Sequence, residues 1–241
     1  MFSMKLKKDG NPNQVAAKIL SYKDTLTSVA VAENPAQASR VTLSGKSCNI
    51  TENMWYDQKT NQVRSGFNVF CNFLNAKRDS DKEKAGFELS GVVLGTKSEL
   101  DKNGEETGRL IVNFGLVGFG GKIDVVDLIA DDKAKAYIES NWEKGDTVNV
   151  VGDICVIQKT VTWTEEQGFG EPIERTRTES RRELVITGGS AGGLEESLSY
   201  DADEVKAALA DRKTRVEATK EKALAKGKST TTATKAENFG F

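Results

Sequence analysis

Histidine is absent from the 241 residues. Without imidazole the chain cannot build a Ser-His-Asp or Cys-His catalytic group, and the zinc sites that use histidine are excluded. The three cysteines, Cys48, Cys71 and Cys155, are odd in number and widely spaced, which indicates reduced, buried thiols in a cytoplasmic protein. We therefore expect no enzyme, no cofactor and no metal site.

Long apolar runs are also missing, so we expect no membrane span, and no apolar core follows the basic first residues to make a signal peptide. Hydrophobic residues make up 37% and charged residues 29%, which is typical of a soluble globular protein with one large or two small domains.

Charge is unevenly distributed along the chain. Residues 85–202 hold 12 basic and 22 acidic side chains, whereas residues 1–84 hold 13 and 8, and residues 203–241 hold 9 and 6. Nucleic-acid binding requires a basic surface. A role of that kind therefore requires the cations of this acidic middle region to gather on one face.

The stretch 109–157 carries the clearest structural pattern. Alternating apolar residues predict one strand over 109–117, four glycines between 115 and 121 predict a sharp bend, and a second strand follows. The four-residue spacing of Ala134, Ile138 and Trp142 predicts a short helix capped by Asp131 or Asp132. A β-branched strand is expected over 147–157. The expected inward residues of the first two strands are Leu110, Val112, Phe114, Leu116, Ile123 and Val125, and the expected outward ones are Arg109, Ile111, Asn113, Lys122 and Asp124.

Further strands are expected over 87–94 and in a hairpin formed by 158–164 and 174–186. The order of three strands, a helix and two strands predicts a mainly β protein with an OB-fold-like Greek-key barrel. We expect a polar loop over 94–108, with turn residues at 101–104.

Five regions are predicted along the chain. The first is an N-terminal arm over 1–40, with a helix at 11–22 and a strand at 25–32. The second is the barrel over 41–187, with a β-hairpin or meander as an N-terminal extension at 41–74, in which one strand is expected at 40–50 and its return at 63–74. A flexible Gly-rich linker over 188–200, a C-terminal helix over 201–226 that Asp201 and Glu204 begin, and a disordered tail over 227–241 follow.

The final hairpin carries the strongest functional pattern. Period-two spacing places Lys159, Val161 and Trp163 on one face of its first strand, and Arg175, Arg177 and Arg181 on one face of its second. Bases stack on aromatic rings, worth about 1–3 kcal/mol each, while cations follow the phosphates of a single strand. Alternatively, Trp163 is a barrel-edge residue and the arginines pair with neighbouring acidic residues, namely Glu165, Glu166, Glu174 and Glu179.

Other aromatic and polar residues form a second set of candidates for nucleic-acid binding. Arg109, Asn113 and Lys122 are expected on the outer face of barrel strands two and three, with Phe119 in the bend beside them. Phe70 lies between two amides on the polar face of its strand, and ordinary packing is the alternative for it and for Phe119. The meander adds Trp55 with Lys59 and Arg64, for which hairpin packing is the alternative.

The strand–helix–strand core, the long basic hairpin and the tail that ends in Phe241 resemble the single-stranded DNA-binding proteins of bacteria and phages. The resemblance covers roughly 41–187 and the tip, and it is one of architecture. It implies a phage-type OB-fold protein that coats single-stranded DNA in DNA replication or recombination, in the cytoplasm of the cell, or of the host if phage-encoded. It also implies that the tail, through Phe239 and Phe241, recruits replication or recombination proteins, although Glu237 is the only acidic residue of the tip.

Two other functions stay open at this stage. The chain could be a structural or assembly protein of virion type, a homo-oligomer in which the barrel is a scaffold and the C-terminal helix mediates association. It could also be a carboxylate-dependent nuclease that uses Asp124 and Asp127, with Asp131 and Asp132 as a second acidic pair. Metal binding by these pairs competes with a simpler interpretation as a helix cap and a solvated edge.

Overall fold

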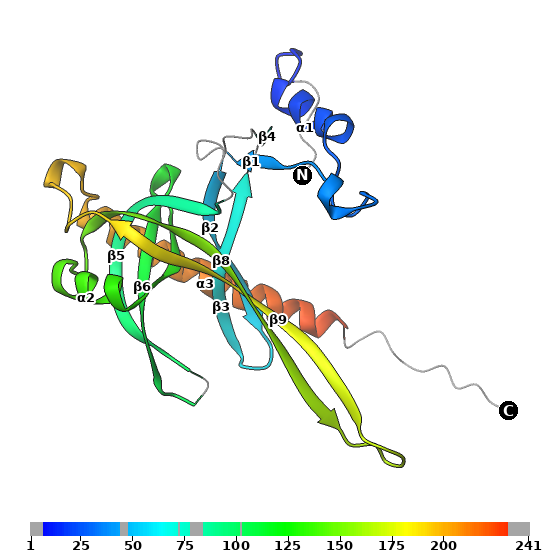
Figure 1. Cartoon of the computed structure of the whole chain (residues 1–241). Helices are drawn as coiled ribbons and strands as arrows, with labels where there is room; N and C mark the ends of the chain where they lie inside the picture. The colour runs from blue at the N-terminus through cyan, green and yellow to red at the C-terminus, as the bar shows by residue number, and fades with distance from the viewer. Residues whose placement is uncertain (1–6, 44–47, 72, 78–83, 102, 231–241) are drawn as a thin grey trace. The chain divides into compact units, whose positions relative to one another are not determined.

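Five strands close into a barrel in the computed structural model of this chain, which describes residues 7–43, 48–71, 73–77, 84–101 and 103–230 (Figure 1). The order around the barrel is β5-β6-β7-β9-β8. The β7–β9 pair is parallel and the other neighbouring pairs are antiparallel. With a helix, α2, between β7 and β8, this is the strand order of the OB-fold, so the predicted fold class is confirmed. The bounds are β5 Gly86–Leu100, β6 Glu106–Val117, β7 Ile123–Ala130, α2 Asp132–Asn141, β8 Thr147–Glu165 and β9 Ile173–Gly189.

The barrel core is built from apolar side chains that alternate along each strand. Val112, Phe114, Leu128, Val148, Val150 and Leu184 are each 0% exposed. The predicted polar loop over 94–108 is wrong, because β5 and β6 pair on to Leu100 and Glu106. Its predicted turn does form, since Asp101 Oδ1 accepts hydrogen bonds from the backbone nitrogens of Asn103 and Glu105.

The burial of β7 differs from the predicted alternation. Asp124, expected outward, is 9% exposed, and Ile123 is fully buried. The C-terminal helix α3 (Ala202–Thr230) packs against this strand, and it supplies Arg215, whose Nη1 lies 3.1 Å from Asp124 Oδ1. A strand covered on its outer side buries residues of both faces, which local periodicity cannot indicate.

Helix α2 confirms the predicted cap, because Asp131 accepts a hydrogen bond from the backbone nitrogen of Ala134. The segment after β9, expected as a flexible linker, is hydrogen-bonded to the barrel side. Trp142 Nε1 donates to the carbonyl oxygen of Ser190 at 3.2 Å. The backbone nitrogen of Leu194 donates to the carbonyl oxygen of Thr147 at 2.8 Å. A 3-10 turn, η4 (Glu196–Leu198), then leads into α3.

Helix α3 begins as predicted, since Asp201 Oδ1 accepts from the backbone nitrogen of Glu204. It continues to Thr230, past the expected end at 226. Leu224, assigned to its apolar stripe, is 45% exposed. In the described part of the chain, no helix has the length and apolarity needed to cross a membrane.

Strands β2 (Cys48–Asp57) and β3 (Gln62–Cys71) form a hairpin within the region predicted as a β-hairpin or meander. Asn61 adopts a positive φ of 55° at its turn, where Asp57 accepts from the backbone nitrogen of Lys59 and from Arg64 Nε. The chain divides into two compact units, and residues 51–67 of this hairpin belong to the unit that contains the barrel, together with 84–241.

The other unit comprises residues 1–50 and 68–83. It contains α1 (Gln14–Thr25), the 3-10 turn η1 (Pro35–Gln37), and the paired strands β1 (Val41–Leu43) and β4 (Leu74–Ala76). The hydroxyl of Tyr22 bonds both backbone groups of Leu74, at 3.1 and 2.9 Å. The predicted strand at 25–32 is wrong, because Val29 and Val31 lie in turns, where both are exposed. Of the strand expected at 40–50, β1 covers 41–43 and β2 begins at Cys48, and of the return strand expected at 63–74, β3 ends at Cys71 and β4 begins at Leu74. Residues 44–47 and 72 lie outside the described residues.

Candidate nucleic-acid interface

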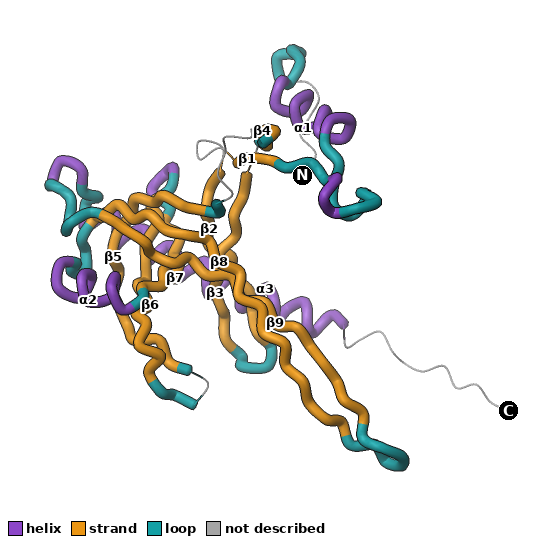
Figure 2. Tube along the Cα trace, in the orientation of Figure 1, coloured by secondary structure: helices purple, strands orange, loops and turns teal. Residues whose placement is uncertain are grey.

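Strands β8 and β9 continue beyond the barrel as a long two-stranded ribbon (Figure 2). Their pairing runs without a break from Ile154 and Leu184 to Glu165 and Ile173. Because directly opposed residues of an antiparallel pair share a face, this register decides which side chains of the two strands meet.

One face of the ribbon alternates apolar side chains with arginines across the strands. Its directly opposed pairs are Ile157 and Arg181, Val161 and Arg177, and Trp163 and Arg175, and these six residues are called the ribbon face below. Trp163 and Ile157 are each 45% exposed. The register thus brings together the aromatic and basic residues that the sequence placed on separate strands. It also pairs Lys159 with Glu179 on this face, although the side chain of Lys159 lies outside the description.

The outer arginines of the ribbon face have acidic partners. Arg175 Nε lies 2.8 Å from Glu165 Oε2, and Arg177 pairs with Glu179. This is the arrangement that the alternative interpretation of the hairpin expected. The side chains of the two arginines are nevertheless 52% and 65% exposed, and exposed ion pairs of this type contribute about 0–1 kcal/mol. A phosphate can replace such a partner at little cost.

At the base of the ribbon the arginines are bound more firmly. Arg181 contacts Glu99 Oε1 at 2.8 Å, and Arg109 contacts Glu183 Oε2 at 2.5 Å. Both carboxylates are buried. Burial raises the pKa of Glu99, but hydrogen bonds from Thr107 and Arg181 and the charge of Arg109 outweigh it, so the pKa of Glu99 is lowered. Arg109, predicted to contact phosphate, therefore joins β5, β6 and β9 as part of a buried ion network.

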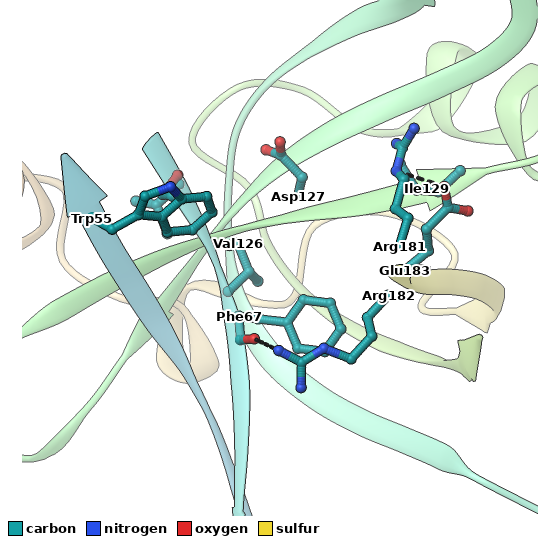
Figure 3. A pocket seen from close by; sticks show the side chains of 11 residues that line it. Trp55, Phe67, Val126, Asp127, Ile129, Arg181, Arg182 and Glu183 are labelled. Carbon is teal, nitrogen blue, oxygen red and sulfur yellow. Dashed lines mark hydrogen bonds and ion pairs between the residues drawn. The ribbon is translucent and has the colours of Figure 1, made fainter. Parts of the chain in front are cut away.

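A pocket of about 250 Å³ lies where the ribbon face reaches the barrel (Figure 3). Trp55 and Phe67 of the β2–β3 hairpin form one wall, and Arg182 stands over the Phe67 ring, 5.6 Å from its centroid. Figure 3 shows Asp127 between Trp55 on one side and Arg181 on the other. The other lining residues are Ser65, Gly66, Val125, Val126, Ile129, Arg181 and Glu183. Of these lining residues, Trp55 was predicted from the sequence, whereas Phe67 and Arg182 were not. Neighbouring residues of a strand point to opposite faces, so the adjacent arginines 181 and 182 were the available signal for Arg182.

The predicted residues on the outer face of β6 and β7 make local contacts. Asn113 Nδ2 donates to Asp127 Oδ1 at 2.5 Å, and Lys122 Nζ lies 3.1 Å from Asp124 Oδ1. Phe119 lies in the 3-10 turn η3 (Phe119–Gly121), and its side chain lies outside the description.

The remaining predicted residues make local contacts, belong to the other unit or lie outside the described residues. Arg64 pairs with Asp57, and the backbone nitrogen of Lys59 bonds the same carboxylate. Phe70 is 57% exposed and belongs to the unit formed by 1–50 and 68–83. Phe239 and Phe241 lie outside the described residues. Among the described residues, no group of three or more His, Cys, Asp or Glu side chains is placed to hold a metal ion.

Comparison with protein families gives one match, to a model described as YorF, over residues 1–222. The chain belongs to the YorF family. No curated protein matches this YorF chain. Among solved structures, the mitochondrial single-stranded DNA-binding protein Rim1 of S. cerevisiae is similar over 45% of this chain and 95% of its own, with 14% sequence identity and a TM-score of 0.28. The OB-fold is assigned from the strand order of the barrel and not from this similarity.

Proposed function

We propose that this chain binds single-stranded DNA with little sequence preference along the ribbon face. The observation that carries the proposal is the β8–β9 register, which sets Trp163, Val161 and Ile157 directly opposite three arginines. Exposed rings with adjacent cations suit a single strand, because bases stack while phosphates are neutralised. The ribbon also connects barrel strands four and five, the position of a loop through which OB-folds bind oligonucleotides.

The dimensions of the ribbon face fit this role. From Ile157 to Trp163 the strand rises about 20 Å, at roughly 3.3 Å per residue. This length accommodates a few nucleotides, in line with the roughly 4–16 nucleotides that an OB-fold binds. Coating of single strands in DNA replication or recombination would follow from binding of this kind.

Titration of the protein with an oligo-dT of about 16 nucleotides tests the proposal. We expect tryptophan fluorescence to be quenched at low salt, and affinity to fall as salt rises, because bound phosphates displace counterions. Trp163→Ala should remove most of the quenching, and Arg177→Ala should weaken binding. Thr176→Ala, on the opposite face of the same strand, is the matched control and should bind normally.

Two results would contradict the proposal. The first is an absence of quenching and of binding at low salt. The second is binding that Arg177→Ala and Thr176→Ala weaken equally, because the ribbon face would then have no special role.

An assembly function is the second candidate, and the ribbon tip favours it. Phe169, in the loop between β8 and β9, is 95% exposed. A ring presented so fully is available to a partner chain, and aromatic residues are enriched in protein–protein interfaces. Light scattering of the native chain and of Phe169→Ala distinguishes the two functions, because only an assembly role predicts an oligomer that this substitution dissociates while DNA binding is absent.

A further inference from the structure

The pocket beside the ribbon contains two carboxylates on one face of neighbouring strands. β7 and β9 run parallel and pair Leu128 with Leu184, so Asp127 and Glu183 occupy equivalent positions one residue earlier. Both line the pocket, and Asn113 donates to one oxygen of Asp127. Strands in a sheet lie about 4.8 Å apart, so a single small ligand can reach both carboxylates.

One oxygen of Glu183 lacks a hydrogen-bond donor among the described residues. The Glu183 side chain is 2% exposed, and within that part of the chain its Oε1 accepts no hydrogen bond. Arg181 Nε lies 2.9 Å away and compensates the charge, but it makes no hydrogen bond with this oxygen. A buried acceptor without a donor is costly, by about 1–3 kcal/mol, so it marks a position where a ligand N–H group would be favoured.

We propose that the pocket takes one unstacked base of the bound strand and prefers guanine. This inference rests on the proposed single-strand binding. Trp55 offers a half-exposed ring for stacking, and the pocket is of a size for one planar ring system. Guanine presents two adjacent N–H donors, the ring nitrogen and the exocyclic amine, on the edge that faces out of an unpaired strand.

The surrounding charges favour a neutral donor over a cation. Arg181 and Arg182 line the pocket beside the two carboxylates, so the charges of the lining balance and a lysine or arginine of a partner protein gains little net attraction there. A guanine ring satisfies acceptors without adding charge, and Arg182, which stands over the Phe67 ring, remains available to a flanking phosphate. Thymine offers a single N–H donor on the same edge and leaves one acceptor unsatisfied.

Three oligo-dT strands that differ at one central position test the proposal: unmodified, with one guanine, and with one hypoxanthine, which lacks the exocyclic amine. By fluorescence anisotropy we expect the guanine strand to bind about tenfold more tightly than oligo-dT, in the range found for a well-placed pair of base contacts. The hypoxanthine strand should fall close to oligo-dT. A single guanine avoids the self-association of guanine runs.

Two variants locate the effect. Asp127→Asn keeps the shape of the side chain but replaces one acceptor oxygen by a donor, so it should abolish the difference in affinity between the guanine strand and oligo-dT, whichever way the removed charge moves the two affinities. Trp55→Ala should remove the preference as well, through loss of stacking. Asp203→Asn, whose side chain on α3 is 88% exposed, is the control and should retain the tenfold difference.

The outcomes separate this inference from the function on which it rests. Equal affinity for the three strands, with oligo-dT still bound, overturns the guanine preference alone. Absence of binding to any strand overturns the proposed function too. If Asp127→Asn lowers the affinity for the guanine strand and for oligo-dT equally, the assignment to this pocket is overturned. It is also overturned if the protein shows no guanine preference but binds an arginine-containing peptide, and Trp55→Ala abolishes that peptide binding.

Discussion

Arg212 of α3 holds the carboxylate of Glu52 in β2 through two hydrogen bonds, from Nε at 2.9 Å and from Nη2 at 2.5 Å. The Glu52 side chain is fully buried, and its Oε2 also accepts from the backbone nitrogen of Val125 in β7. The bond to Glu52 raises the pKa of Arg212. One carboxylate thus joins the hairpin, the barrel wall and the C-terminal helix.

Removal of Arg212 should therefore destabilise this unit strongly. Arg212→Ala leaves the buried Glu52 charge without its partner, and we expect the free energy of unfolding to fall by about 3–5 kcal/mol. Urea denaturation followed by circular dichroism measures the change. Lys206→Ala removes an exposed pair with Asp203 on the same helix and should change stability by less than about 0.5 kcal/mol. Equal effects of the two substitutions would show that the Glu52 contact adds nothing.

Gly152 marks the bend where β8 passes from the barrel to the ribbon. A Cβ at this position would lie 2.2 Å from the carbonyl oxygen of Val185 and 2.4 Å from a ring carbon of Phe87. Neither neighbour is the end of a flexible chain, so Gly152→Ala should lower the free energy of unfolding by about 1–3 kcal/mol or more. Thermal unfolding compares it with Gly168→Ala, where nothing lies within 4 Å of the new atom. A Gly152→Ala protein as stable as this control would contradict the close packing at the bend.

The elements of the barrel were predictable where local patterns decide them. The spacing of Ile138 and Trp142 and the β-branched run from Thr147 each specify one element, and both form as expected. The burial of Asp124 was not predictable, because it depends on Arg215, some 90 positions later in the chain. The strand expected at 25–32 failed for the opposite reason, since its valines remain exposed.

The candidate site likewise combines features that local sequence patterns indicate with contacts between distant residues that they do not. Period-two spacing was sufficient to place Trp163 and the arginines on faces of their own strands, and the register then shows that these are the same face. The contact of Arg181 with Glu99 was not predictable, because Glu99 comes from another hairpin 82 residues earlier. The same holds for the contact of Arg182 with Phe67, which requires the β2–β3 hairpin to lie against β9.

The ion network at the base of the ribbon should make stability depend on acid pH. The pKa of Glu99 lies below its ordinary value of 4.5, so its ionised form is favoured in the folded state. The resulting stability is fully present above that value and is lost as pH falls through the lowered pKa. Thr107→Val removes one donor to Glu99, so the loss of stability as pH falls below 4.5 should become smaller. Urea denaturation at several pH values measures it, with Thr178→Val on the ribbon as control. An unchanged pH dependence in Thr107→Val would show that Glu99 does not contribute.

The acidic partners of the ribbon arginines provide a test in which affinity should rise. If Arg175 and Arg177 neutralise phosphates, Glu165 and Glu179 compete with the DNA for them and also repel it. The double substitution Glu165→Gln and Glu179→Gln should tighten oligo-dT binding by about five- to tenfold, since each exposed pair contributes up to about 1 kcal/mol. The salt dependence should steepen at the same time, because freed arginines contact more phosphates. Glu139→Gln, on the exposed side of α2, changes the net charge without touching the ribbon and separates local competition from a general charge effect. If the double variant binds no better than Glu139→Gln, the arginines are not phosphate ligands, and the exposed ring of Trp163 must be assigned to a protein partner instead.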